Sequence, residues 1–415
     1  MADQTTILIL GGSFAGLASA HYALRHILPK LPANPPTPYT VTLVNPSADF
    51  WWRIGAPRSI ASPSTLPFSK TVIPIAPAFS SYGSSFLFVE GAATAVDPET
   101  RTTTIALTDG TEKQITYTSL IIATGFSTPC PLFTVPTTGD TAALQTLTST
   151  FQKSLSSAKT VVIGGGGPVG VETAGEIAEV LNGKPGFFAP AAPKDPKAKI
   201  TIVTADSKML PVLRAELSKT AEKHLKRLGV EVQYGTKVVS ATEKEGAKTA
   251  VQLSSGETIE ADIYIDATGS RPNSSFLPPA WLDARARVAA NAKTLRVDAS
   301  PRTYVVGDVG SYTRGGALDL ADAIPVALTN LRTDLVAHLA SATPGPDRVY
   351  TANLKESQLV PIGSGKGVGA FNGNVLPSLM VWGIKGRDYM LGMAKGTVNG
   401  DAYKKEGKWV PEVKA

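Results

Sequence analysis

The amino-acid sequence predicts an α/β fold because two short sequence patterns each occur twice, in the same order. The first is an apolar run that leads into glycines and a helix-like stretch; it begins at residues 5–10 and returns at 160–163. The second is an apolar strand that ends in Ala-Thr-Gly, at 123–125 and again at 267–269. Strand, glycine turn and helix in this order are typical of Rossmann-like dinucleotide-binding domains. From the order of these four segments we infer that the second domain is inserted within the first.

These patterns divide the chain into three regions. After Asp347 the composition becomes glycine-rich and apolar, and from Asp401 onward it is dotted with lysines. This change sets apart a small C-terminal region of α+β type. The expected boundaries are 1–130 and 270–345 for the first dinucleotide-binding domain, 131–269 for the second, and 346–415 for the C-terminal region.

The composition is that of a folded globular protein and excludes several functional classes. With 415 residues, 43% of them hydrophobic and 18% charged, the chain holds about three domains. The net charge of +6 comes without blocks of like charge, so no nucleic-acid partner is expected. The one cysteine, Cys130, excludes a disulfide scaffold, a cysteine zinc cluster and a redox cysteine pair. We expect no metal, and we interpret the four histidines as structural or solvent-facing: His21, His26, His224 and His338.

The sequence carries no recognisable targeting signal. The first apolar strand begins too near the start for a signal peptide, and residue 2 is Ala, not the glycine of a myristoylation signal. Residues 375–384 are apolar but contain Pro377 and Gly383, and they are far shorter than the ~18–20 residues that span a bilayer. We therefore expect a cytoplasmic protein, with contact to an intracellular membrane surface left open.

The inserted domain carries the motif Gly165-x-Gly167-x-x-Gly170, which follows a strand and opens a helix. Its glycines allow a tight turn and close approach of the backbone to a pyrophosphate, which the helix N-terminus attracts. Glu172 and Glu176 extend the motif along the helix.

The strand after this helix ends at Thr204, where an acidic residue commonly holds a ribose hydroxyl. Without that acid a 2′-phosphate meets no repulsion, and Lys208 lies nearby in the sequence. NADPH is slightly favoured over NADH, and both remain open.

The first domain departs from the same pattern at two positions. Ser13 replaces the second glycine of Gly11-Gly12-Ser13-Phe14-Ala15-Gly16, and its hydroxyl can contact phosphate. Asn45 ends the next strand in place of an acid and can still bond a ribose. A later strand ends in Asp308, whose carboxylate suits a ribityl hydroxyl of a flavin; capping of the next helix is the alternative.

Together these sequence motifs resemble those of the two-dinucleotide-binding-domain flavoproteins of the pyridine nucleotide-disulfide oxidoreductase superfamily. Within it the chain resembles the apoptosis-inducing-factor-like branch, which includes the ferroptosis suppressor proteins and is related to type II NADH:quinone oxidoreductases. The C-terminal phrases at 365–369 and 384–388 are similar to the ending of that branch. The resemblance spans nearly the whole chain.

The resemblance implies FAD in the first domain, NAD(P)H in the second, and hydride transfer across the flavin ring. It gives Glu172 a nicotinamide-side role and Lys385 an acceptor-side role; the alternatives are a glutamate that only favours the helix dipole and a solvated lysine. The residues implied to bind the two cofactors are Gly11, Gly12, Ser13, Ala15, Gly16, Asn45, Ala123, Thr124, Gly125, Gly165, Gly167, Gly170, Thr204, Gly269, Asp308 and Pro325.

Without a cysteine pair, electrons must leave the reduced flavin directly for a diffusible acceptor. We expect an FAD-dependent NAD(P)H oxidoreductase with a quinone-like acceptor. Residues 376–382 are interpreted as an acceptor entrance, a membrane contact or core. Two alternatives stay open: a flavin-dependent oxidase or reductase that tailors one metabolite, and a regulatory flavoprotein that responds to NAD(P)H. Homodimer formation is also left open.

Overall fold

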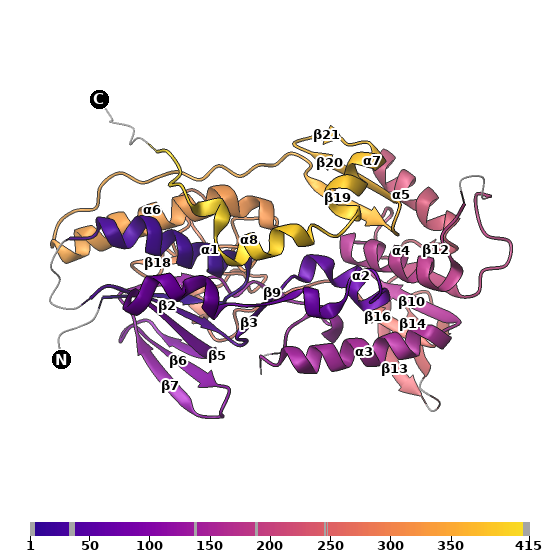
Figure 1. The fold of residues 1–415 in the computed structure, drawn as a ribbon, viewed down its shortest axis with the longest axis horizontal. Coiled ribbons are helices and arrows are strands. Elements are labelled where there is room, and N and C mark those ends of the chain that lie inside the picture. Colours follow the sequence, from indigo (N-terminus) through magenta and orange to yellow (C-terminus); the bar gives the residue numbers. More distant parts are fainter. Residues whose placement is uncertain are drawn as a thin grey trace.

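The computed structural model describes residues 5–32, 38–136, 139–186, 190–244, 246 and 248–409. Two lobes lie side by side along the long axis of the molecule (Figure 1). The first lobe contains the sheet that starts the chain, the second contains the inserted domain, and the C-terminal region crosses from the second lobe back to the first.

The first lobe is built on a seven-stranded sheet of order β18-β8-β1-β2-β5-β6-β7. Its strands and main helices are β1 Thr6–Leu10, α1 Phe14–Tyr22, β2 Thr40–Asn45, β3 Asp49–Trp51, β4 Val72–Pro74, β5 Phe86–Asp97, β6 Thr102–Leu107, β7 Glu112–Thr116, β8 Ser119–Ile122, β18 Thr303–Val305 and α6 Leu320–Leu339. The central strands pair in parallel, and β6 and β7 extend the edge antiparallel. Every residue of β1 is buried, which explains its unbroken apolar run.

The second lobe holds a four-stranded parallel sheet of order β12-β11-β10-β16 beside a three-stranded antiparallel sheet. Its elements are α3 Thr141–Ser157, β10 Thr160–Gly164, α4 Pro168–Asn182, β11 Lys199–Val203, α5 Ala215–Arg227, β12 Val230–Gln233, β13 Val238–Lys244, β14 Lys248–Leu253, β15 Thr258–Ala261 and β16 Ile263–Asp266. The helix α2 Ala56–Ala61 follows β3 in the chain but packs against α3 and α4 of the second lobe (Figure 1).

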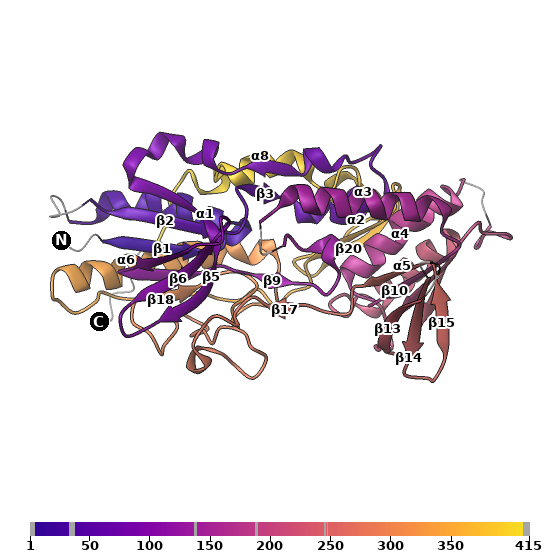
Figure 2. The ribbon, with the colours of Figure 1, turned by 90° about the horizontal axis from the view of Figure 1, so that it is seen from below.

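Two short strands join the lobes, and Figure 2 shows them between the two sheets. β9 (Phe126–Ser127) follows the first Ala-Thr-Gly turn, and β17 (Arg271–Pro272) follows the second. They pair antiparallel, so the chain leaves and re-enters the first lobe at one place. This arrangement confirms the predicted fold class of two Rossmann-like domains, one inserted in the other.

The C-terminal region is a small α+β unit that touches both lobes. Its elements are β19 Gln358–Ile362, β20 Lys366–Phe371, β21 Asn374–Val375, α7 Ser378–Val381, the π-helix η9 Trp382–Gly386 and α8 Ala394–Val398. The three strands form an antiparallel sheet against α4 and α5, and α8 packs on α1.

His21 fastens the C-terminal region to the first lobe and is fully buried. Its Nε2 contacts Val398 O at 2.8 Å, its Nδ1 contacts Tyr82 Oη at 3.1 Å, and its ring stacks on Phe79. Because carbonyl oxygen only accepts, Nε2 carries a proton. Burial lowers the pKa of His21 from 6.5 to about 4.

We therefore expect acidification from pH 7 to pH 5 to destabilise the fold through His21. Between pH 6.5 and about 4 the unfolded chain binds a proton that the folded chain does not, so stability falls as the pH drops through this window. The loss is at most about 3 kcal/mol. Urea midpoints at both pH values should differ less in His21→Gln than in wild type. His338 is more exposed and its pKa is also lowered, so His338→Gln should reduce the difference by less than His21→Gln does. Equal pH dependence in all three proteins would contradict this assignment.

Candidate functional site

Two cavities open where the parallel strands of the two lobes end. The first has a volume of about 320 Å³ and the second about 520 Å³. Phe126 of β9 lines both, because β9 is where the chain passes between the lobes. The predicted residues that line the first cavity are Gly11, Gly12, Ser13, Asn45, Ala123 and Thr124. Those that line the second are Gly165, Gly167, Thr204 and Gly269.

The glycine turns of the two lobes have the same geometry. Gly11 has φ +102° and Gly165 has φ +110°. A Cβ on Gly11 would lie 2.5 Å from Ala123 O, and a Cβ on Gly165 would lie 2.2 Å from Ala267 O. Both oxygens belong to the backbone and cannot move aside. Each turn thus presents bare backbone beneath a helix N-terminus, a cradle suited to a pyrophosphate.

The third glycine of each motif has a packing role and does not line a cavity. A Cβ on Gly16 would lie 1.6 Å from Gly11 O, and one on Gly170 would lie 2.0 Å from Gly165 O. These glycines let α1 and α4 start directly against their own turns.

Ser13 is the N-cap of α1, yet its side chain makes no capping bond to that helix. The residue is exposed and lines the first cavity. Its hydroxyl therefore fits the predicted role as a phosphate contact.

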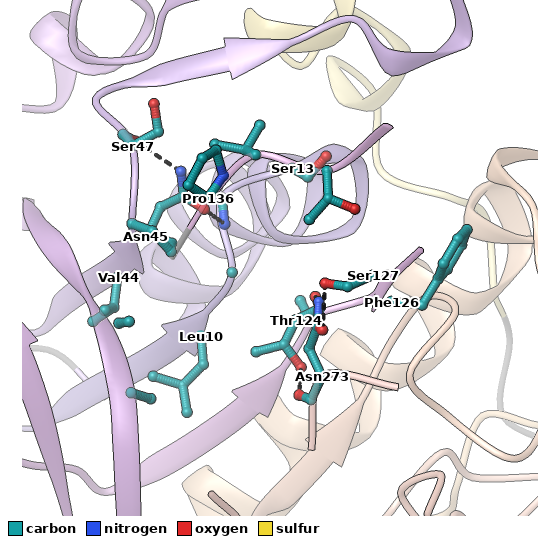
Figure 3. Close-up of a pocket in the computed structure, with 18 of the residues that line it drawn as sticks. Leu10, Ser13, Val44, Asn45, Ser47, Thr124, Phe126, Ser127, Pro136 and Asn273 are labelled. Atoms are coloured by element: carbon teal, nitrogen blue, oxygen red, sulfur yellow. Dashed lines mark hydrogen bonds between the residues drawn. The ribbon is translucent and has the colours of Figure 1, made fainter. Parts of the chain in front are cut away.

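Asn45 lies at the end of β2, as predicted, but both polar ends of its side chain are engaged within the protein (Figure 3). Oδ1 accepts a hydrogen bond from Gly12 N at 2.7 Å, and Nδ2 donates to Ser47 O at 2.7 Å. Asn45 thus holds the glycine turn against the next loop, and its bond to a ribose remains a prediction.

Asn273 is a residue of the first cavity that the sequence did not indicate. Its Nδ2 donates to Thr124 O, its Oδ1 accepts from Ser127 Oγ, and its backbone O accepts from Thr124 Oγ1, all within 2.9 Å (Figure 3). It binds the returning segment after β17 to the first Ala-Thr-Gly turn. No local pattern marks it, because the contact spans 149 residues.

Arg53 supplies a buried cation to the wall of the first cavity. Its Nη2 donates to Phe133 O at 3.0 Å, and its guanidinium lies 4.7 Å from the centroid of the Phe126 ring. Burial lowers the pKa of Arg53, and the Asp308 carboxylate opposes this shift. A partly desolvated cation beside the glycine cradle fits an anionic cofactor such as FAD.

Asp308 lies close enough to the first cavity for its carboxylate to act on Arg53, which lines it, but Asp308 is not itself in the cavity wall. Its Oδ1 accepts a hydrogen bond from Gly316 N at 2.7 Å. The contact of Asp308 with a ribityl hydroxyl remains a prediction. Of the other residues implied for the cofactors, Ala15, Gly125 and Pro325 also lie outside both cavity walls.

Lys208, which lies near Thr204 in the sequence, is not in the wall of the second cavity, and its role toward a 2′-phosphate remains a prediction. Its ammonium points at the carbonyl oxygens of Pro211 and Leu213. Lys237 and Asp206 line the wall instead. Lys237 was missed because it follows β12 and lies far from Thr204 in the sequence.

Glu172 and Lys385 form a buried ion pair. Lys385 Nζ lies 2.5 Å from Glu172 Oε1 and also donates to Leu359 O at 3.1 Å. The side chains are 4% and 16% exposed, so neither a freely solvated lysine nor a surface glutamate describes them. Burial raises the pKa of Glu172, and the Lys385 ammonium opposes this shift. The pair lies one helical turn beyond Val169 of α4, which lines the second cavity.

Cys130 is a buried free thiol, and burial raises its pKa to about 11. In the described part of the chain, no group of three or more His, Cys, Asp or Glu side chains could hold a metal ion. None of the helices described is both long and apolar enough to cross a membrane.

Comparisons with known proteins agree with this geometry. Residues 5–329 match the family described as pyridine nucleotide-disulphide oxidoreductase. Oxidoreductase phnG of Penicillium herquei is 40% identical, covering 97% of this chain and 98% of that one. Ferroptosis suppressor protein 1 of Xenopus tropicalis is 26% identical, covering 93% and 94%. The sulfide:quinone oxidoreductase structure from Aquifex aeolicus has a TM-score of 0.68 at 16% identity, covering 95% and 92%.

The family match spans most of the chain and contains both glycine turns, both cavities and the Glu172 position. The chain therefore belongs to the pyridine nucleotide-disulphide oxidoreductase family, and it is an oxidoreductase that uses FAD and NAD(P)H.

Proposed function

We propose that this oxidoreductase passes electrons from NAD(P)H through FAD directly to a diffusible, quinone-like acceptor. The observation that carries the proposal is the buried Glu172–Lys385 pair, which lies between the inserted lobe and the C-terminal region. The single cysteine supports it, because one buried thiol with a pKa of about 11 cannot form a disulfide relay within the chain.

The residues present would hold the two cofactors in the two cavities. Gly11, Gly12, Ser13 and Arg53 would hold FAD, and Gly165 with its turn would hold the nicotinamide dinucleotide. When bound, FAD supplies a two-electron carrier between the nicotinamide and the acceptor.

The chain itself supplies a paired carboxylate and ammonium. Lys385 Nζ can donate a proton to an oxygen of the acceptor, and Glu172 keeps this ammonium in place and charged. Because the pair is mostly withdrawn from water, its electrostatic interactions are stronger than those of an exposed pair.

Similarity to proteins that are named for a quinone or for ferroptosis suppression supports the acceptor class and the apoptosis-inducing-factor-like branch. The second candidate, an oxidase or reductase specific for one metabolite, is favoured by the higher identity to Oxidoreductase phnG, 40% against 26%. The two candidates differ in turnover with simple quinones, which should be fast only for the first.

The first test is an anaerobic titration with NADH and NADPH, followed by addition of a quinone panel and then air. Wild-type flavin absorbance should bleach with one nucleotide and recover rapidly with a quinone. Glu172→Gln should retain FAD but be reduced at least about tenfold more slowly, because the carboxylate proposed to act on the nicotinamide side is lost. Glu216→Gln, an exposed glutamate in the first turn of α5, is the matched control.

Failure of both nucleotides to bleach the flavin would contradict the proposed function. Cys130→Ser should keep both half-reactions, because the thiol lies outside both cavities. Slow recovery with every quinone but fast recovery with one particular metabolite would favour the second candidate.

An exposed apolar patch adjoins Lys385 and supports a lipophilic acceptor. Leu379 is 75% exposed and Met380 is 50% exposed, whereas Val381 is buried, so α7 contributes both to the surface and to the core. The other exposed apolar residues of this patch are Phe371, Val375 and Ile384. Several exposed apolar side chains in one small unit commonly mark a binding face, and a membrane surface that holds the quinone is the partner proposed for it.

Replacing Leu379 and Met380 by glutamate should raise the KM for a long-tailed quinone in phosphatidylcholine–phosphatidylglycerol vesicles about tenfold. The KM for benzoquinone in water should not change. Val239→Glu, an equally exposed apolar position on the inserted lobe, is the control. Parallel changes for both quinones would show that the patch has no role in delivering the acceptor.

A further inference from the structure

A second buried carboxylate lies one helical turn from Glu172, on the same face of α4. Glu176 receives two parallel hydrogen bonds from Arg58 of α2, Nε to Oε2 at 3.0 Å and Nη2 to Oε1 at 2.8 Å. Both side chains are 4% exposed. A bidentate pair at such burial fixes the direction as well as the distance of its partners.

Arg58 also binds the segment that follows Lys385. Its Nη1 donates to Gly386 O at 2.7 Å and to Arg387 O at 3.0 Å, and its guanidinium lies 4.7 Å from the centroid of the Tyr389 ring. Tyr389 Oη donates to Glu176 Oε1 at 3.1 Å. One guanidinium therefore joins α2, which comes from the N-terminal segment of the chain, to α4 of the inserted lobe and to the C-terminal region.

Hydrogen bonds of the Tyr389 backbone connect Lys385 to the wall of the first cavity. Tyr389 N donates to Lys385 O at 2.7 Å, and Trp52 Nε1 donates to Tyr389 O at 2.8 Å. Trp52 stands between Trp51 and Arg53, which line the first cavity. The wall of that cavity is thereby linked to the turn that carries the Lys385 ammonium.

The charge of Glu172 and those of its three charged neighbours sum to zero. Glu172 faces the ammonium of Lys385, the carboxylate of Glu176 and the guanidinium of Arg58, which together with Glu172 make two negative and two positive groups. Tyr389 stays neutral, since burial and the carboxylates raise its pKa well above 10. Removal of one charge therefore changes the potential at Glu172 with a sign that depends on which charge is removed.

We propose that Arg58 and Glu176 are positioning residues of the reaction: they hold Lys385 in place and set the charge balance that keeps Glu172 ionised. The inference rests on the proposed function of the Glu172–Lys385 pair. Arg58 and Glu176 are not proposed to contact the substrate.

The test is the pH profile of flavin reduction by the nucleotide that wild type uses. In the proposed nicotinamide-side role Glu172 acts in its ionised form, so the rate of flavin reduction falls below the pKa of Glu172. Arg58→Met leaves Glu176 uncompensated and should move this acidic limb to higher pH. Glu176→Gln removes a negative neighbour and should move the limb to lower pH. The double variant should return toward the wild-type limb, because neither lone charge remains.

The matched control is Arg214→Met, which breaks an arginine–glutamate pair between the start of α5 and Glu356 ahead of β19. That pair joins the inserted lobe to the C-terminal region but is 40% and 23% exposed, so its loss should not move the limb. Bound FAD is measured in every variant as the check on folding. If Arg58→Met loses FAD, Arg58→Lys should show a smaller shift in the same direction, since the charge remains and the bidentate contact is lost.

Shifts of the same sign in Arg58→Met and Glu176→Gln, or no shift in either, would overturn this inference while leaving the proposed function intact. Wild-type protein that neither NADH nor NADPH reduces would instead overturn the proposed function. The two failures are therefore separate results of one set of measurements.

Discussion

Four ionised side chains lie where the two lobes and the C-terminal region meet, and each must keep a partner of opposite charge. Taking an ion out of water costs several kcal/mol unless a close, well-oriented counterion replaces the lost hydration. The pairs here are Arg58–Glu176 and Lys385–Glu172, and they draw on α2, α4 and η9. Each ion pair joins residues from two different regions of the chain. Both pairs therefore form only when the regions are arranged as observed.

The backbone near Lys385 is unusual in ways that this charge constraint explains. Lys385 lies in the π-helix η9, a form that is rare and often found at functional sites. Tyr389 and Met390 then take φ values of +53° and +59°, which cost side-chain-bearing residues roughly 1–3 kcal/mol each. The bonds from Arg58 to Gly386 O and Arg387 O and from Trp52 to Tyr389 O offset that cost.

Sequence analysis was most informative for residues whose type is required by the backbone conformation at their own position. Gly11 and Gly165 could be predicted because a positive φ and close approach of another backbone demand glycine. Asn273 and Arg58 could not, because their roles are set by partners more than a hundred residues away. An isolated arginine in the sequence gives no sign of the carboxylate it will meet.

The wall of the second cavity shows the same limit. Thr204 lines it, as the apolar run before it indicates, because Thr204 directly follows β11. Lys208 is close to Thr204 in the sequence, but its ammonium binds nearby carbonyl oxygens, and Lys237, from the loop after β12, lines the wall. The edge of a parallel sheet gathers loops from several strands, so the residue that lines a cavity need not be near the motif that predicts it.

The point of insertion finally explains why the chemistry is placed between the lobes. In a parallel sheet the glycine turns and the Ala-Thr-Gly turns lie at the same edge, the carboxyl ends of the strands. The chain crosses between lobes directly after these turns, through β9 and β17, so the cofactor-binding edges of both sheets are tied together and Phe126 lines both cavities. Electrons can then pass directly between the two cofactors. Because the chain has one cysteine and no redox pair to carry them onward, the proposed function gives the acceptor side to the C-terminal region, through Lys385.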